Sequence, residues 1–268
     1  MINDPKLEND FNVLFLGDII GRSGRECIEN GLAPILQEHR IDFVIANGEN
    51  AAGGFGINSK IAYHFLENGI DCITTGNHIW KNKDILEVLD KEKRILRPAN
   101  YPAGSPGRGY SIYKRGNKKI LVINLLGRLN LLEVDCPFQK ANEILEAIDK
   151  NSFDISIVDF HAEVTSEKVA MGWFLDGRVS AVIGTHTHVQ TADERILYNG
   201  TAYITDAGMT GSFNSVIGME KESIINHFLT RMPKKFQVAS GDEKINGVVV
   251  SISDQNKARA IYRINHLV

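Results

Sequence analysis

Apolar residues are grouped along the chain in short consecutive runs, each followed by a polar turn. The runs are rich in β-branched residues and read NVLFLGD, DFVIANGEN, DCITTGNH, ISIVDFHAE, SAVIGTHTH and TAYITDAG. Runs without polar alternation are typical of strands that are buried on both faces. The pattern therefore predicts strands inside the fold, with layers packed on both of their sides.

Stretches with helical periodicity lie between the first four of these strands, which gives a βαβ alternation. The expected helices span residues 25–39, 58–68, 81–91 and 138–150. Two segments depart from the alternation: residues 109–126 predict a hairpin with its turn at residues 115–117, and residues 246–265 predict a second strand pair. We expect a layered α/β fold with parallel strands and an antiparallel edge.

Length and composition favour one domain. A chain of 268 residues that is 43% hydrophobic can build a single substantial core. We expect one domain over residues 1–268, with residues 1–11 as a polar N-terminal extension. Residues 208–236 begin with a glycine-rich stretch and continue into a helical one, and we expect them to form a flap beside the active site.

Charge, hydropathy and cysteine content narrow the class of protein. The net charge is −3 and the basic residues are dispersed, which argues against duplex nucleic acid as a partner. Neither a signal peptide nor an apolar run that could span a bilayer is evident. Cys27, Cys72 and Cys136 are far apart and lack a Cys-x-x-Cys spacing, so we expect reduced thiols in a cytoplasmic protein without a membrane partner.

Side chains that can bind metals follow five of the predicted strands. They are Asp18, Glu49, Asn50, Asn77, His161, His186 and His188. Open α/β sheets bind their ligands at the carboxyl ends of the strands, so these residues are expected to converge on one rim.

Other roles are open for some of these residues when each is taken alone. Asp18 and Asn77 could cap helices, and the histidines could be structural. Glu49 is harder to explain in that way, because a carboxylate behind an apolar strand is costly to bury without a cation or several donors.

The donor set combines oxygen and nitrogen without thiolate. Such a set suits manganese, iron or zinc, and suits magnesium less well because it contains three histidines. Two metals at the spacing of about 3.5–4 Å that is typical of two-metal hydrolases require a bridging carboxylate.

The order of these motifs resembles the calcineurin-like metallophosphoesterases. The motifs are GD, GEN, GNH, a solitary His and GTHTH, and phrases such as GDIIGRSGR, NGENAAGGFGI and GTHTHVQTAD are similar to the bacterial YmdB-type branch. The resemblance extends from Val13 to the carboxyl terminus. It implies an αββα metallophosphoesterase-like sandwich with mixed sheets and a metal-dependent phosphodiesterase, with iron or manganese as the first expectation and zinc or magnesium as alternatives.

One departure from the superfamily affects the ligand set. The common opening motif is Asp-x-His, whereas Ile19 and Ile20 follow Asp18 here, so one histidine ligand is missing. The resemblance implies that Asn50 takes its place and that Glu49 bridges two divalent or mixed-valence ions. The other ligands implied are Asp18, Asn50 and His188 for one ion, and Asn77, His161 and His186 for the second.

Charge balance connects this site to phosphate chemistry. Two divalent ions, two carboxylates and a bridging hydroxide leave a net charge of about +1, which attracts a phosphate ester. The hydroxide would attack phosphorus, and His78 is the candidate for protonating the leaving oxygen. The resemblance also implies a catalytic histidine at this position. Glu163 could orient a ligand histidine or begin a helix, whereas Asp206 and Thr187 are expected to be structural.

Several functions remain open at this level. The resemblance favours a 2′,3′-cyclic or 3′,5′-cyclic nucleotide as substrate, and a phosphomonoesterase or a slow metal-binding regulatory protein are the alternatives. The glycines of residues 17–24 superficially resemble a dinucleotide-binding turn, but their spacing is wrong for that motif. A homodimer or homotetramer is the expectation for a bacterial enzyme of this size.

Overall fold

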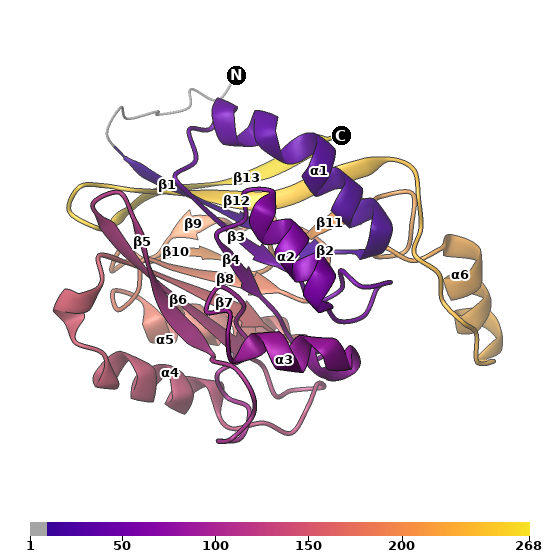
Figure 1. Ribbon diagram of the computed structural model, residues 1–268, viewed down its shortest axis with the longest axis horizontal. Helices are drawn as coiled ribbons and strands as arrows, with labels where there is room; N and C mark the ends of the chain where they lie inside the picture. Colours follow the sequence, from indigo (N-terminus) through magenta and orange to yellow (C-terminus); the bar gives the residue numbers. More distant parts are fainter. Residues whose placement is uncertain (1–9) are drawn as a thin grey trace.

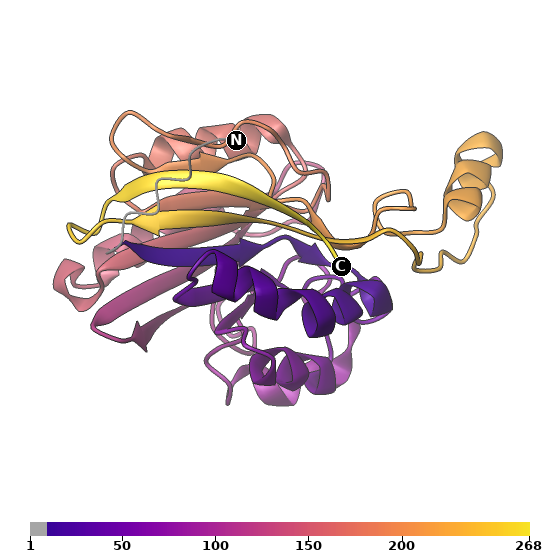
Figure 2. The same cartoon turned by 90° about the horizontal axis from the view of Figure 1, so that it is seen from above.

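The computed structural model describes residues 10–268. Its strands form two sheets that lie face to face, and helices cover the outer side of each sheet (Figure 1, Figure 2). The expected αββα sandwich is therefore confirmed. Most of the expected N-terminal extension lies outside the described residues, and the first strand already begins at Phe11.

The first sheet mixes parallel and antiparallel strands. Its members are β1 (Phe11–Leu16), β2 (Asp18–Ile19), β3 (Phe43–Asn47), β4 (Cys72–Thr74), β11 (Met209–Ser212), β12 (Glu243–Ile252) and β13 (Ala258–Leu267). The order is β2-β11-β12-β1-β3-β4, with β13 also paired to β12. Strands β1, β3 and β4 are parallel, whereas β12 runs antiparallel to β1.

The second sheet is parallel in its centre and antiparallel at its edges. It contains β5 (Tyr110–Arg115), β6 (Lys118–Leu126), β7 (Ile155–His161), β8 (Ala181–Thr185), β9 (Arg195–Ile196) and β10 (Ala202–Ile204). The order is β5-β6-β7-β8-β10-β9. The pairs β5–β6 and β12–β13 are antiparallel neighbours, so both strand pairs predicted from the sequence are confirmed.

Most of the predicted helices are present, but one is wrong in extent. The helices are α1 (Gly21–Glu38), α2 (Ser59–Glu67), α3 (Leu86–Leu89), α4 (Pro137–Ala147), α5 (Thr165–Leu175) and α6 (Lys221–Thr230). The expected helix over 81–91 is replaced by two 3₁₀ turns and the short α3. The backbone of Asn82 is extended, and its side chain donates to the carbonyl of Phe55. Polar side chains that bind neighbouring loops in this way compete with helix formation.

The strands are apolar throughout because alternate residues face two different layers. On β1, Val13 and Phe15 join the core between the two sheets, whereas Leu14 and Leu16 pack beneath α1 and α2. A third cluster, which includes Val158, joins the second sheet to the helices on its outer face. This arrangement explains the consecutive apolar runs, since neither face of a central strand reaches solvent.

The segment expected as a flap consists of two different parts. Strand β11 is buried within the first sheet. Beyond it, the chain leads to α6, which buries none of its residues Lys221–Thr230 and stands apart from the body of the molecule (Figure 2).

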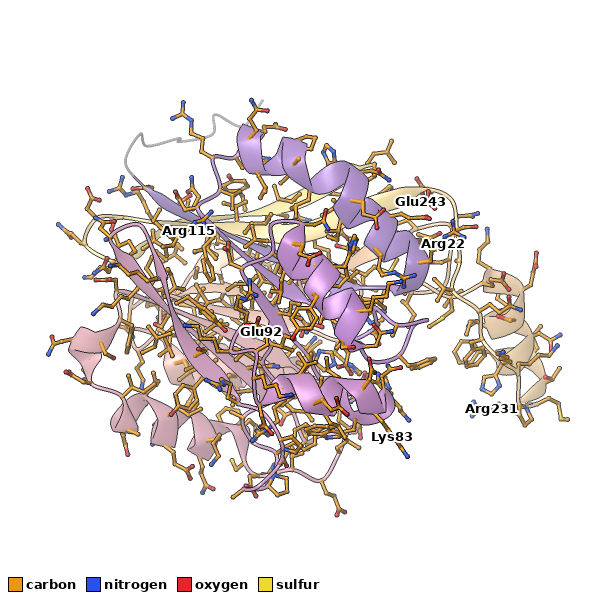
Figure 3. The ribbon with its side chains drawn as sticks, in the orientation of Figure 1. Arg22, Lys83, Glu92, Arg115, Arg231 and Glu243 are labelled. Carbon is orange, nitrogen blue, oxygen red and sulfur yellow. The ribbon has the colours of Figure 1, made fainter. Side chains whose placement is uncertain are left out.

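Charged side chains are spread over the surface. Arg22, Lys83, Arg115 and Arg231 lie on different parts of the chain (Figure 3). Within residues 10–268, no helix is both long and apolar enough to cross a bilayer.

Candidate metal centre

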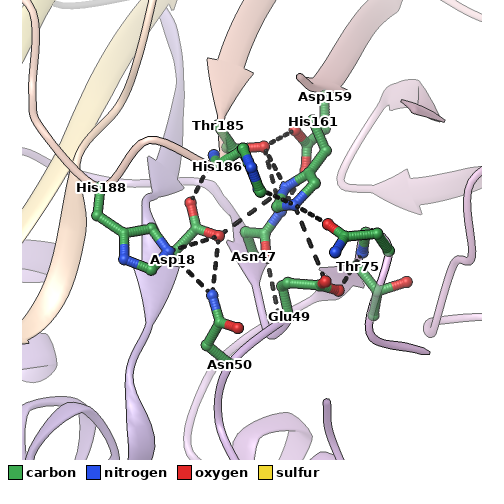
Figure 4. Close-up of polar contacts among 12 residues, drawn as sticks. Asp18, Asn47, Glu49, Asn50, Thr75, Asp159, His161, Thr185, His186 and His188 are labelled. Atoms are coloured by element: carbon green, nitrogen blue, oxygen red, sulfur yellow. Dashed lines mark hydrogen bonds and ion pairs between the residues drawn. The ribbon is translucent and has the colours of Figure 1, made fainter. Parts of the chain in front are cut away.

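The candidate ligands lie at the carboxyl ends of strands from both sheets. Asp18 and Glu49 follow β1 and β3 of the first sheet, and Asn77 follows β4. From the second sheet, His161 ends β7 and His186 follows β8. The structure brings these groups together as the sequence predicts, although the rim is shared between two facing sheets and not formed by one (Figure 4).

Four of the candidate ligands converge around the ring of His161. Its Nε2 atom lies 3.0 Å from Nδ1 of His186, 3.2 Å from Oδ1 of Asn77 and 3.9 Å from Oε1 of Glu49. Metal–ligand bonds of about 2.0–2.2 Å place neighbouring ligands about 3 Å apart. These four side chains therefore have the spacing of ligands around a common cation.

A second group lies around Asp18. Its Oδ1 atom is 3.7 Å from Nε2 of His188 and 3.5 Å from Nδ2 of Asn50. The Asn50 amide nitrogen is 3.0 Å from the same His188 atom. Because the two ends of a carboxamide are assigned from their surroundings, rotating this amide by half a turn would bring its oxygen to the position of a metal ligand.

Each of the three histidines is held by a partner outside the centre. The held atoms are Nδ1 of His161, Nε2 of His186 and Nδ1 of His188. Their partners, in the same order, are Oγ1 of Thr185 at 2.9 Å, Oε2 of Glu163 at 3.0 Å and the carbonyl oxygen of Ile217 at 3.0 Å. The other nitrogen of each ring faces the centre, which is the arrangement by which outer partners orient metal-binding imidazoles. Glu163 thus contacts a candidate ligand histidine, which is one of the two roles that the sequence left open for it.

A buried polar network behind His161 escaped the sequence analysis. Thr185 Oγ1 donates to Asp159 Oδ1 at 2.8 Å, and Asn47 Nδ2 donates to Asp159 Oδ2 at 2.9 Å. Because the Thr185 hydroxyl donates to Asp159, it accepts from Nδ1–H of His161 and leaves the Nε2 lone pair free. Asn47 Oδ1 also accepts the backbone N–H of Glu49 at 2.9 Å. The available signal was Asp159, which interrupts an apolar strand two residues before His161 and therefore shares its face.

The protonation states agree with a cation site. Burial lowers the pKa of His161, of His188 and of His186, which falls to about 3, so these rings are neutral and keep a lone pair. Burial, together with the negative charge of Asp206, raises the pKa of Asp18 well above its usual value. A buried carboxylate among neutral imidazoles is costly without a cation, so these residues fit a metal.

The loop that carries His186 and His188 has an unusual backbone. Both residues have positive φ angles, 100° and 64°, a conformation that persists only where surrounding contacts impose it. Thr187, between them, donates through its N–H and its hydroxyl to Asp206 Oδ2, at 3.1 and 2.7 Å. Asp206 in turn pairs with the buried Lys168 at 2.6 Å. These contacts support the structural roles that the sequence analysis expects for Thr187 and Asp206.

The helix-capping alternatives do not hold. Ile20 is at the N-cap position of α1 and His78 at that of the turn Ile79–Lys81, in each case without a side-chain cap. Neither Asp18 nor Asn77 caps a helix, which leaves both side chains for the centre.

Close packing surrounds Glu49 and His161. The backbone N–H groups of Gly76 and His78 donate to the two carboxylate oxygens of Glu49. A Cβ atom on Gly76 would lie 2.3 Å from the His161 ring, so only glycine fits there. His78 Nδ1 lies 3.1 Å from Glu49 Oε1. This contact does not have the geometry of a hydrogen bond, and the atom has no other hydrogen-bond partner among the described residues.

The carboxamides belong to the candidate ligand set. Among residues 10–268, no three His, Cys, Asp or Glu side chains form a metal site by themselves. The amide oxygens of Asn50 and Asn77 are therefore candidates to complete the coordination.

Residues 14–264 match the model of the YmdB-like protein family. The chain belongs to this family. It is 48% identical over 245 residues to the 2′,3′-cyclic-nucleotide 2′-phosphodiesterase of Bacillus subtilis strain 168, covering 91% of this chain and 92% of that protein.

Two solved structures share the fold of this YmdB-like chain. The crystal structure of a novel phosphatase of Mycoplasma pneumoniae has a TM-score of 0.90 and 38% identity, covering 97% of this chain and 94% of that one. A hypothetical protein from Thermus thermophilus has a TM-score of 0.89 and 38% identity, covering 96% of this chain and all of the other, 100%. The family match, together with the likeness to the Mycoplasma pneumoniae phosphatase, implies divalent metal cofactors for this YmdB-like chain.

Proposed function

We propose that this chain is a phosphodiesterase with two metal ions and that its substrate is a cyclic nucleotide. The preferred candidate is a 2′,3′-cyclic nucleotide, and the alternative is a 3′,5′-cyclic nucleotide. The broader class, a phosphoric ester hydrolase, is confirmed by the family match and the 48% identical Bacillus relative. The observation that carries the finer proposal is the convergence of buried carboxylates with three neutral imidazoles, each held from outside the centre.

The proposed ligands divide into two sets that share Glu49. One set is Asp18, Asn50 and His188, and the other is Asn77, His161 and His186, as their mutual distances support. When bound, divalent ions of iron or manganese would activate water near neutral pH and neutralise the phosphate oxygens. Lys168, a cation close to the centre, is already paired with Asp206 at 2.6 Å, so it is not free to neutralise a phosphate, and bound metal ions would supply that charge.

His78 is the proposed proton donor. Its ring lies beside Glu49 and is partly exposed, with 24% of the side chain accessible, so it can reach a bound ester from the solvent side. In the proposed reaction the oxygen of a water molecule bonds to phosphorus, the bond from phosphorus to O2′ breaks, and O2′ takes a proton from His78. The proton that the water gives up then restores the protonated form of His78. The product is a nucleoside 3′-phosphate.

A panel of substrates tests the proposal. Wild type and His78→Ala are assayed with iron or manganese on 2′,3′-cyclic AMP, 3′,5′-cyclic AMP and p-nitrophenyl phosphate, a monoester. We expect the wild type to prefer a cyclic diester and His78→Ala to lose about 10²–10⁴-fold in kcat. The cofactor is checked separately by the metal content of both proteins, which should be equal.

Other outcomes identify the alternatives. Preference for the monoester would make the chain a phosphomonoesterase, in line with the name of the Mycoplasma pneumoniae relative. A metal-loaded wild type that hydrolyses none of the three would point to a regulatory protein and overturn the proposal.

A further inference from the structure

Phe55 lies at the edge of the candidate metal centre. Its side chain is 42% exposed. The ring centre is 5.1 Å from that of His78, and the two planes meet edge to face at 88°. Isolated exposed apolar residues are common on protein surfaces, so the exposure alone assigns no role to Phe55.

The loop that carries Phe55 is tightly built. It follows the candidate ligand Asn50 directly, and the N–H of Gly54 donates to the Asn50 carbonyl at 3.1 Å. Gly54 and Gly56 have positive φ angles of 94° and 73°, which glycine adopts without strain. A Cβ atom on Gly56 would lie 2.8 Å from the carbonyl oxygen of His78. The backbone therefore holds Phe55 in a defined position against the His78 segment.

The proposed chemistry determines what Phe55 would meet. If His78 protonates the leaving oxygen, the group attached to that oxygen lies on the His78 side of the phosphate. In a 2′,3′-cyclic nucleotide that group is the ribose, and the base is attached to the carbon next to the one that carries O2′. A partly exposed aromatic ring beside His78 is thus within reach of the base.

We propose that Phe55 is the stacking platform for the nucleobase of the substrate. The inference rests on the proposed function, because it uses the position of the leaving group. A phenyl face accepts every base, since each has a π-face, so Phe55 would select nucleotides over base-free phosphodiesters without choosing among the bases.

Two cyclic phosphodiesters separate a base contact from an effect on catalysis. One is 2′,3′-cyclic AMP and the other is glycerol 1,2-cyclic phosphate, which has the same five-membered ring and no base. For Phe55→Ala we expect KM for the nucleotide to rise on the order of 10-fold with little change in kcat. The kinetics of Phe55→Ala on the glycerol ester should not change, and a separate Phe55→Trp variant should keep the low KM for the nucleotide.

A matched variant controls for the loss of an exposed aromatic ring. Tyr63 lies on α2 with 41% exposure, close to that of Phe55. Tyr63→Ala should leave both substrates unaffected. If Phe55→Ala changed both substrates equally, the residue would act through His78 and base stacking would be refuted; no change on either substrate would refute it as well.

Direct binding keeps this inference separate from the proposed function. Calorimetry measures the affinity of adenosine 3′-phosphate and of glycerol phosphate for wild type and Phe55→Ala. If Phe55→Ala loses affinity for adenosine 3′-phosphate but not for glycerol phosphate, the stacking platform is supported. This holds even if the wild type hydrolyses neither ester, a result that would defeat only the proposed reaction. Equal affinities in wild type and variant would defeat the platform.

Discussion

Replacing Thr185 with valine removes one buried hydroxyl and almost no volume. That hydroxyl donates to Asp159 at 2.8 Å, lies 2.9 Å from Nδ1 of His161 and 3.3 Å from Nδ2 of Asn47. All of these groups are fully buried, so water cannot replace the lost partner. Each buried polar group left without a partner costs roughly 1–3 kcal/mol, and two short contacts are lost, so we expect the free energy of unfolding to fall by about 2–6 kcal/mol.

The effect on the metal is the more specific part of this prediction. Without Thr185 as acceptor, Nδ1–H of His161 is no longer held, and the ring is free to change tautomer or orientation. Loss of such an outer partner typically weakens metal affinity by roughly 10–100-fold. Urea unfolding of the metal-free protein measures the stability, and competition with a chromophoric chelator measures the affinity.

Thr201→Val is the matched control. Thr201 is also fully buried, and its hydroxyl donates to the Val179 carbonyl at 2.7 Å and accepts the N–H of Gly177 at 2.9 Å. It precedes β10, at the opposite end of the second sheet from the centre. This control should lose stability and keep its metal affinity. Unchanged metal affinity in Thr185→Val would refute the role assigned to the network behind His161.

Three further predictions follow from other parts of the structure. Lys168→Met leaves the buried Asp206 carboxylate without its cationic partner at 2.6 Å, so the free energy of unfolding should fall by about 3–5 kcal/mol in urea titrations. A smaller loss than that of Thr201→Val would contradict a stabilising role for this ion pair. Burial raises the pKa of Cys27 to about 12 and raises that of Cys72 further, whereas Cys136 is partly exposed; a thiol reagent at pH 8 should therefore modify Cys136 alone in the folded protein, as peptide mapping would show. Metal-loaded protein should melt at a higher temperature than protein treated with a chelator. At a free metal concentration 1,000 times Kd, binding should add about 4 kcal/mol to the free energy of unfolding, and identical melting curves would argue against a metal site.

Local patterns in the sequence were sufficient for much of the fold. The hairpin β5–β6 and the pair β12–β13 were predictable because strand alternation and turn residues are properties of neighbouring positions. The helix expected over 81–91 was wrong because side chains such as Asn82 bind a loop that is distant in sequence. Propensity cannot anticipate a contact of that kind.

The candidate ligands were also visible in the sequence, since polar residues directly after apolar strands stand out. The partners that orient them were not. Asn47 and Thr185 are ordinary residues at strand ends, and only the facing of two sheets and the register between neighbouring strands bring them to Asp159, at separations of 112 and 26 residues.

The amino-acid sequence by itself determined which strands are buried, the layered α/β class of fold and the chemical identity of the donor groups, because these depend on composition and on short-range periodicity. The tertiary structure alone decided that the donors meet between the ends of two sheets, which nitrogen of each imidazole faces inward, and that Phe55 lies against His78. Those features depend on distances between segments that are far apart in the chain. The packing of the layers sets these distances, and no local sequence pattern encodes them.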